Sequence, residues 1–134
     1  MAPDNEIRVP SGAGQWSDGL REILRRVPAE YGRYIDVGPG WYPIIVQLDR
    51  DLAQIDPGYV VHQVKEKFGG LRYYFAATRA DLLPAMNRLV GAAEEAAART
   101  CEITGNAGVR MVKTGWYKTL DPAIAPEGYV PVDS

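Results

Sequence analysis

Three polar side chains on one predicted strand face form the densest candidate for acid–base chemistry in the sequence. By alternation, His62 and Glu66 share this face, and Glu66 lies beside Tyr73 on the facing strand. The same positions equally suit a buried polar network, with His62 as a hydrogen-bonded core residue and Glu66 as an anchor paired with an arginine. We favour that network and predict no catalytic residue, because no serine, cysteine or second histidine lies nearby in sequence to complete a nucleophile and base pair.

Basic and aromatic residues occupy the opposite face of the same strands. Alternation places Lys65, Lys67, Arg72 and Tyr74 there. In binding to single-stranded nucleic acid, such cations follow the phosphates while a ring stacks on a base. A second run of candidate binding residues lies nearer the C-terminus and comprises Arg110, Lys113, Trp116, Tyr117 and Lys118. For the two aromatic residues of that run, we favour a core position over an exposed recognition surface.

A predicted β-hairpin over residues 60–75, VVHQVKEKFGGLRYYF, positions the first of these sets. β-branched and aromatic residues alternate with charges on either side of Gly69 and Gly70. A type I′ turn needs positive φ at both central positions, which glycine adopts freely, so we place the turn at these two glycines. The predicted cross-strand pairs are then Phe68 with Leu71, Glu66 with Tyr73, and Val64 with Phe75.

Helical spacing of apolar residues predicts three helices around this hairpin. One follows the candidate caps Ser17 and Asp18 and ends at Pro28, a second covers residues 41–55, and a long third one runs from residue 79 or 80 to residue 100. Asp49 and Asp51 invite a catalytic carboxylate pair, but residues two apart on a helix point in different directions, so we assign both to the solvated face. Gly91 inside the third helix costs roughly 1 kcal/mol relative to alanine, which suggests a close contact there.

Composition and charge are those of one globular domain. The chain has 134 residues, 46% hydrophobic and 24% charged, with a formal net charge of −2 and a pI near 5.4. This balance argues against a wholesale nucleic-acid binder but leaves room for a local basic patch. With one cysteine, no signal-peptide core and no stretch of transmembrane length, we expect a cytoplasmic location and no membrane partner. We assign residues 1–15 to a flexible arm, residues 16–120 to the domain and residues 121–134 to an extended tail.

Four segments carry a specific motif string: GWY at 40–42, VKEKFGGLRYYF at 64–75, TCEITGNAG at 100–108 and GWYKTL at 115–120. Together they resemble a small protein family common in bacteriophage and prophage genomes. In that family a KEKFGGLRFY-like hairpin is followed by a helix and a small zinc ribbon, of the form CExCG, a few residues, GGWYxTLC and a further Cys or His. The resemblance covers roughly residues 38–120, and it implies a fold and a genomic setting more than an activity.

The zinc ligands of that family are largely missing from this sequence. Cys101 matches the first ligand, but Thr104 and Asp121 stand where the second and third should be, and Ala123 or Ile124 stands near the last. Tetrahedral zinc takes four Cys, His or carboxylate ligands, so one thiolate and one carboxylate are too few. We therefore predict neither bound zinc nor another cofactor. The glycines and asparagine of residues 104–108 still favour a knuckle, followed by a second hairpin over 109–120 that turns near Thr114 and Gly115.

The combined prediction is an α+β fold. It has two N-terminal helices, antiparallel β-hairpins packed against a long helix, and a C-terminal hairpin derived from a ribbon without its metal.

Three functional hypotheses follow from these predictions. The first is a non-catalytic accessory protein of bacteriophage or mobile-element type that binds a host or phage protein, with Trp41, Tyr74, Trp116 and Tyr117 as exposed aromatic candidates. The alternative is a nucleic-acid-binding protein that uses the basic hairpin face. The least favoured is a small enzyme centred on the polar cluster of His62, Glu66 and Tyr73.

Overall fold

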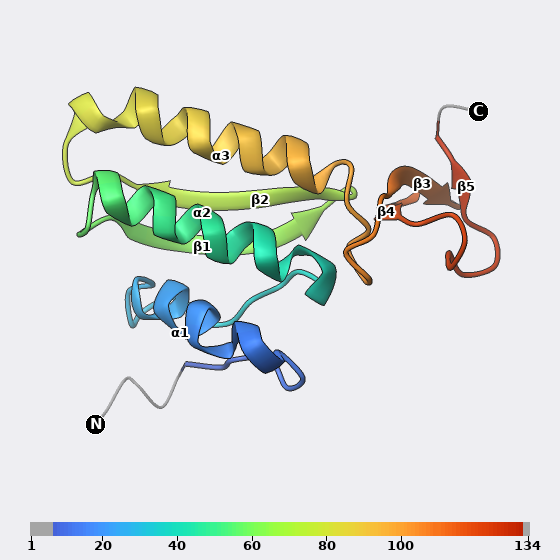
Figure 1. The fold of residues 1–134 in the computed structure, drawn as a ribbon, viewed down its shortest axis with the longest axis horizontal. Coiled ribbons are helices and arrows are strands. Elements are labelled where there is room, and N and C mark those ends of the chain that lie inside the picture. Colours follow the sequence, from blue (N-terminus) through green and yellow to red (C-terminus); the bar gives the residue numbers. More distant parts are fainter. Residues whose placement is uncertain (1–6, 133–134) are drawn as a thin grey trace.

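The computed structural model describes residues 7–132 and has three α-helices and two small antiparallel sheets, which confirms the predicted α+β class (Figure 1). The helices are α1 (Ser17–Arg25), α2 (Tyr42–Ile55) and α3 (Leu83–Ala97), each preceded by a short 3-10 turn, η2 (Gly14–Trp16), η3 (Pro39–Trp41) and η4 (Ala80–Leu82). The strands are β1 (Val60–Lys67), β2 (Gly70–Ala76), β3 (Val109–Lys113), β4 (Trp116–Leu120) and β5 (Val130–Pro131). No helix in the described part of the chain is long and apolar enough to cross a membrane.

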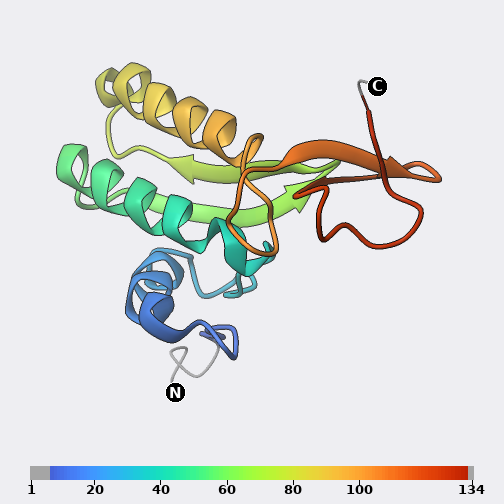
Figure 2. The ribbon, with the colours of Figure 1, turned by 45° about the vertical axis from the view of Figure 1, so that its right-hand side comes forward.

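One face of the β1–β2 hairpin packs against α2 and α3 and forms the main core (Figures 1 and 2). Its fully buried members include Ile45, Leu52, Val61, Leu71 and Met86. α1 packs on α2 on the side away from α3, and Gly19 permits a close approach, because a Cβ at this position would lie 2.6 Å from Val46 Cγ1. The hairpin therefore has one covered face and one that carries exposed side chains, which we call the outer face.

Residues 7–15 pack on the domain, so they do not form the flexible arm that we predicted. Ile7 and Val9 contact the main core, Arg8 N donates a hydrogen bond of 2.9 Å to Arg33 O, and Ala13 is buried. The prediction rested on the lack of regular periodicity in this segment. Burial of its apolar side chains nevertheless stabilises it against the domain. Residues 1–6, the beginning of the predicted arm, lie outside the described residues.

The register of the first hairpin differs from the predicted one by two residues. The observed pairs include Val64 with Tyr73, Lys65 with Arg72, Glu66 with Leu71 and Lys67 with Gly70. The turn is centred on Phe68 and Gly69, at φ 56° and 84°, so our placement at the two glycines is wrong. One local and one tertiary hydrogen bond stabilise the observed turn. Gly69 N donates to Glu66 Oε2 at 2.7 Å, and Thr119 Oγ1 of β4 donates to Gly69 O at 2.7 Å. Since the shift is even, each paired side chain keeps its predicted face.

A β-bulge turns His62 toward the outer face. Val61 pairs with Phe75 and Gln63 pairs with Tyr74, so His62 is an extra residue between two paired positions. Val61 is fully buried, whereas His62 is exposed. Our prediction that His62 lies on the apolar face is therefore wrong, because strict alternation fails where a bulge adds one residue.

Residues 100–132 form a small three-stranded sheet with its knuckle, which we call the ribbon (Figure 2). The predicted second hairpin is present as β3 and β4, with Thr114 and Gly115 in the turn at φ 50° and 83°. β5 pairs with the other edge of β3, so the predicted tail contributes a strand; residues 133–134 lie outside the described residues. The ribbon's own buried core is limited to Cys101, Met111 and Leu120, with Ala125 and Tyr129 against it. A core of this size does not stabilise a sheet alone, so the ribbon depends on its contacts with the domain.

The ribbon docks on the domain beside η3 through backbone contacts. Gly40 N donates to Glu102 O at 2.7 Å, and Trp41 Nε1 donates to Thr100 O at 2.8 Å. A Cβ on Gly40 would lie 2.1 Å from Cys101 O, so only glycine allows this approach. Trp41 is fully buried, which corrects its assignment to the exposed aromatic candidates.

Asp49 lies in the interior, so its assignment to the solvated face of α2 is wrong. Only 4% of this residue is exposed, Arg26 Nε donates to Asp49 Oδ1 at 2.7 Å, and Tyr59 OH donates to the same oxygen. The hydroxyls of Tyr59 and Tyr73 share a further hydrogen bond of 2.8 Å. Burial, reinforced by the nearby charge of Asp49, raises the pKa of both tyrosines, so both phenols stay protonated. Helical spacing alone could not predict this network, because the cationic partner of Asp49 is Arg26 at the end of a different helix.

Replacement of Asp49 by alanine is expected to lower the free energy of unfolding by about 3 kcal/mol, because Arg26 and Tyr59 lose their buried partner. Asp51→Ala is the matched control, since Asp51 lies on the same helix and its carboxylate accepts a hydrogen bond from the exposed Gln47. Its effect is expected to stay within about 0.5 kcal/mol. Urea titrations measure both variants, and equal effects would contradict the role assigned to Asp49.

Gly91 in α3 makes no close contact, contrary to our expectation, because a Cβ built there meets no atom within 4 Å. Gly91→Ala is therefore expected to raise the free energy of unfolding by about 1 kcal/mol, since alanine loses less backbone entropy in a helix. Gly40→Ala is the contrasting variant and is expected to destabilise the fold, because its Cβ has no space. Thermal unfolding distinguishes the two, and an unchanged or lower midpoint for Gly91→Ala would refute the interpretation.

Candidate functional site

The predicted basic residues of the first hairpin meet on its outer face. Lys65 and Arg72 are directly opposite each other across β1 and β2, and the next outer pair along the strands is Gln63 with Tyr74. Lys67 and Tyr74 are exposed, whereas Lys65 and Arg72 are half-buried. Like charges directly opposite each other destabilise a hairpin, so this pair lowers stability in the absence of an anion.

No carboxylate neutralises these cations within residues 7–132. Lys65, Lys67 and Arg72 form no ion pair with any Asp or Glu of that range. Two acidic residues lie close by without forming an ion pair with these cations. Glu66 is on β1 itself but on its opposite face, and the exposed Asp36 is the parallel β-bridge partner of Lys65, with Asp36 N donating to Val64 O at 3.1 Å. The outer face is therefore a locally cationic surface on an acidic protein.

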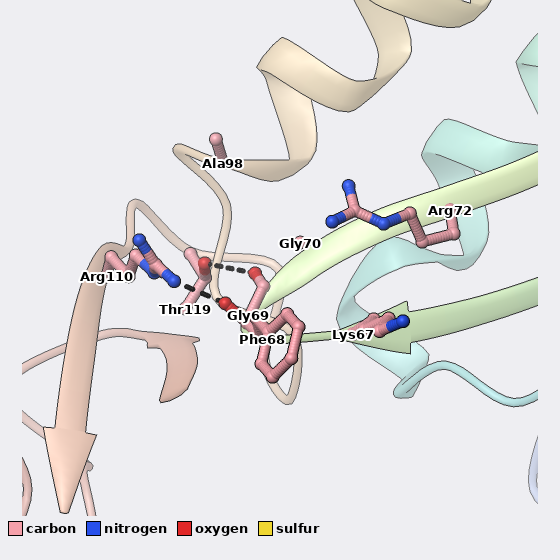
Figure 3. A pocket seen from close by; sticks show the side chains of 8 residues that line it. All are labelled: Lys67, Phe68, Gly69, Gly70, Arg72, Ala98, Arg110 and Thr119. Carbon is pink, nitrogen blue, oxygen red and sulfur yellow. Dashed lines mark hydrogen bonds between the residues drawn. The ribbon is translucent and has the colours of Figure 1, made fainter. Parts of the chain in front are cut away.

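A cationic pocket lies where the outer face meets the ribbon (Figure 3). It has a volume of about 320 Å³, and its lining includes Lys67, Arg72 and Arg110 but no acidic residue. Figure 3 shows the guanidinium groups of Arg72 and Arg110 on either side of the turn of the first hairpin. Arg110 is held there because its Nε donates to Phe68 O at 3.2 Å and its guanidinium stacks 4.2 Å from the centre of the Tyr117 ring. Residues distant in sequence thus combine into one cationic surface.

The other candidate residues of the ribbon have different surroundings. Trp116 is 73% exposed, so the core position that we favoured for it is wrong, while Tyr117 is half-buried beneath Arg110. Trp116 sits next to the turn of its hairpin, where no other element covers it. Together with the exposed Phe68 it lines a groove of about 480 Å³ between the two hairpin turns. Lys113 pairs with Trp116 across the second hairpin, and its ammonium nitrogen lies 6.0 Å from the centre of the Tyr129 ring.

Lys118 is engaged between two carboxylates. Its ammonium nitrogen lies 3.1 Å from Glu66 Oε1 and 3.5 Å from Glu102 Oε1, and we call these three residues the carboxylate clamp. Glu66 is thus a structural anchor, but its cationic partner is a lysine and not the arginine that we predicted. Glu102 Oε2 also accepts a hydrogen bond of 3.0 Å from Gly38 N. Burial raises the pKa of Glu102, although the charge of Lys118 opposes this shift.

The predicted polar cluster of His62, Glu66 and Tyr73 does not come together. His62 is on the outer face and meets the Tyr31 ring edge-on at 5.7 Å, Glu66 belongs to the carboxylate clamp, and Tyr73 is buried against Tyr59. The bulge and the ribbon contacts cause this separation. The three side chains therefore form neither the acid–base site nor the single polar network that the sequence suggested.

An aromatic hollow of about 490 Å³ lies on the outer face beside the bulge, and sequence reasoning missed it. Its lining residues are Tyr31, Gly32, Tyr34, His62, Gln63 and Tyr74. The segment after α1 brings Tyr34 alongside β1, where Ile35 and Val37 are buried and Tyr34 is 46% exposed. In the sequence, the apolar Ile35 and Val37 alternate with the polar Asp36, a signal that could have identified this segment as strand-like.

Hydrogen bonds join the predicted knuckle at residues 104–108 to Cys101 and Asp121. Thr104 N lies 3.5 Å from Cys101 Sγ and donates to it, and Asp121, at the place of the third ligand, accepts from the Asn106 amide at 3.5 Å. Burial disfavours the thiolate of Cys101, but hydrogen bonds from Thr104 and neighbouring N–H groups outweigh burial and lower its pKa. Within the described residues, no group of three or more His, Cys, Asp and Glu side chains is arranged to hold a metal ion.

Comparisons with known proteins assign no family to this geometry. A scan against protein-family models found no match, and searches of curated proteins and of solved structures found no significant similarity. The resemblance to the phage and prophage family therefore stays a prediction from the motif string.

The raised pKa of Glu102 has a consequence for stability. Because the folded pKa lies above the unfolded value, the stabilisation from protonation is fully present below the ordinary carboxyl pKa and is lost as pH rises through the raised pKa. Glu102→Gln imitates the neutral carboxyl, so it is expected to be more stable than wild type at about pH 7, with the difference shrinking toward about pH 4. Urea titrations across this range test the prediction, with the exposed Glu95→Gln as control. A difference that grows on acidification would contradict it.

Proposed function

We propose that this protein is a non-catalytic nucleic-acid-binding protein that uses the outer face of the β1–β2 hairpin. The observation that carries the proposal is the cross-strand pair of Lys65 and Arg72, which forms no ion pair with any carboxylate of residues 7–132. This arrangement costs stability in the free protein, and a bound phosphate relieves the repulsion. Lys67 and the cationic pocket extend the same charge toward the ribbon.

The shape of the surface also supports this function. A nucleic-acid backbone is an extended line of anions, and the cations lie along the hairpin from Lys65 to the cationic pocket. A local cationic surface of this kind is compatible with the overall net charge of −2. The proposal places the protein in the cytoplasm, where it would meet nucleic acid, and the motif resemblance suggests a phage or mobile-element setting.

Fluorescence anisotropy of labelled single- and double-stranded DNA and RNA, repeated across a salt series, tests the proposal. We expect affinity to fall steeply with salt, because bound phosphates release counterions. Lys65→Ala with Lys67→Ala is expected to lower affinity about tenfold at low salt and to reduce the slope by about 1.4, which corresponds to two lost phosphate contacts at about 0.7 each. Asp36→Asn is expected to raise affinity severalfold, because it removes the exposed acid beside β1.

The matched control is Arg50→Ala with Arg88→Ala, which removes the same net charge from exposed positions on α2 and α3. This control is expected to leave the salt slope unchanged, since the two helices cover the opposite face of the hairpin. Equal losses in both double variants would show that only global charge matters. No binding at low salt would refute the proposed function.

A protein partner at the groove between the two hairpin turns is the second candidate function. Trp116 at 73% exposure and Phe68 at 58% are the most exposed large apolar side chains in the described range, and both line this groove. Exposed aromatic anchors of this kind dominate binding energy in protein interfaces. If oligonucleotides do not bind, an affinity pull-down from host lysate that compares wild type with Trp116→Ala tests this candidate.

A further inference from the structure

The aromatic hollow combines ring faces with free polar groups on the same outer face as the cations. Rings of Tyr31, Tyr34, His62 and Tyr74 contribute to its lining. Within residues 7–132, no hydrogen bond engages the hydroxyls of Tyr34 and Tyr74 or the side chains of His62 and Gln63. Its volume of about 490 Å³ is within the range of small-ligand sites, roughly 300–1,000 Å³. The hollow therefore offers stacking surfaces together with hydrogen-bonding groups that the fold itself does not use.

The β-bulge builds this hollow. Without the extra residue, His62 would point into the apolar core; with it, His62 and Gln63 both face the outer side opposite Tyr74. Gly32 completes the wall, because a Cβ there would lie 2.7 Å from Cε1 of Tyr34 and would displace that ring. The bulge moves a polar residue out of the core and places it beside three tyrosines. β-Bulges that redirect a side chain in this way are common next to functional sites.

We propose that the aromatic hollow takes an unpaired base of a single-stranded nucleic acid, whose adjoining phosphate binds Lys65 and Arg72. This inference rests on the proposed function and names its ligand class. The pair of Gln63 and Tyr74 is followed two residues along the strands by the pair of Lys65 and Arg72, a separation of about 7 Å. A base in the hollow therefore has its phosphate within reach of both cations.

Charge complementarity favours a nucleotide over an apolar peptide as the occupant. No acidic residue lines the hollow, and the adjacent cations form no ion pair with a carboxylate of the described residues. The rim of the hollow carries phenol, amide and imidazole groups. Stacking on several rings tolerates any base, and the polar rim can meet a base edge. A base-paired duplex cannot insert a base into the hollow without unstacking it, so single strands are preferred.

His62 provides the test because it is the only histidine in the chain. In untagged protein, its imidazole carbon-bound protons give isolated NMR signals that report on the hollow. We expect a short deoxythymidine oligonucleotide to shift these signals through the ring current of the bound base. An abasic oligonucleotide of the same length, which keeps the phosphates, is expected to bind more weakly and to leave the signals in place.

Ring-removing variants complete the experiment. Tyr34→Leu with Tyr74→Leu is expected to lower single-strand affinity about tenfold with an unchanged salt slope, while Tyr34→Phe with Tyr74→Phe retains most of the affinity. Both tyrosines are about half exposed, at 46% and 45%, so the substitutions leave the core intact. Thermal unfolding of each variant verifies this.

The outcomes separate this inference from the proposed function. Salt-dependent binding without a His62 shift, with equal affinity for the abasic strand or for a duplex, overturns the hollow as a base site and leaves nucleic-acid binding in place. Shifts of His62 caused by a proline-rich peptide but not by the oligonucleotide also overturn it and assign the hollow to a protein ligand. Absence of any oligonucleotide binding removes both proposals.

Discussion

The carboxylate clamp is the constraint on which the arrangement of the two sheets depends. Glu102 accepts a hydrogen bond from Gly38, just before η3, with its side chain and one from Gly40 of η3 with its carbonyl. It also shares Lys118 with Glu66 of the first hairpin. The ribbon's own core is too small to hold it in place by apolar burial. Its position is therefore set by directional contacts, which fix Arg110 against the turn of the first hairpin and so complete the cationic pocket.

Polar groups are fully paired in the interior of the protein but not on the outer face. Among the described residues, every buried side-chain nitrogen and oxygen has a hydrogen-bond partner, and the charge of Asp49 is matched by Arg26. On the outer face, by contrast, Lys65 and Arg72 oppose each other, and neither forms an ion pair with a carboxylate of the described residues. The buried polar groups are thus all hydrogen-bonded, whereas the two cations on the outer face repel each other. The groups that still lack a partner of opposite charge are therefore those that a ligand can reach.

Two local irregularities shape that face. The bulge at His62 redirects the lone histidine outward, and the segment at residues 34–37 extends the hairpin as a strand-like edge that adds Tyr34. Neither changes the core, because Val61 and Val64 remain buried on both sides of the bulge. Binding features are thus added to the open side of the hairpin without altering the packing of its covered side.

The sequence by itself determined the elements of this protein, because apolar spacing and turn residues are local signals. It predicted three helices, two hairpins, the turn at Thr114 and Gly115, and the face on which Lys65, Lys67, Arg72 and Tyr74 lie. Only the tertiary structure decided what depends on contacts between distant segments. Gly69 packing on β4 selected the register, Arg26 of a different helix made Asp49 a buried anion, and the bulge and residues 31–34 created the aromatic hollow. Periodicity assigns each residue a face of its own element, but it does not state which other element, if any, covers that face.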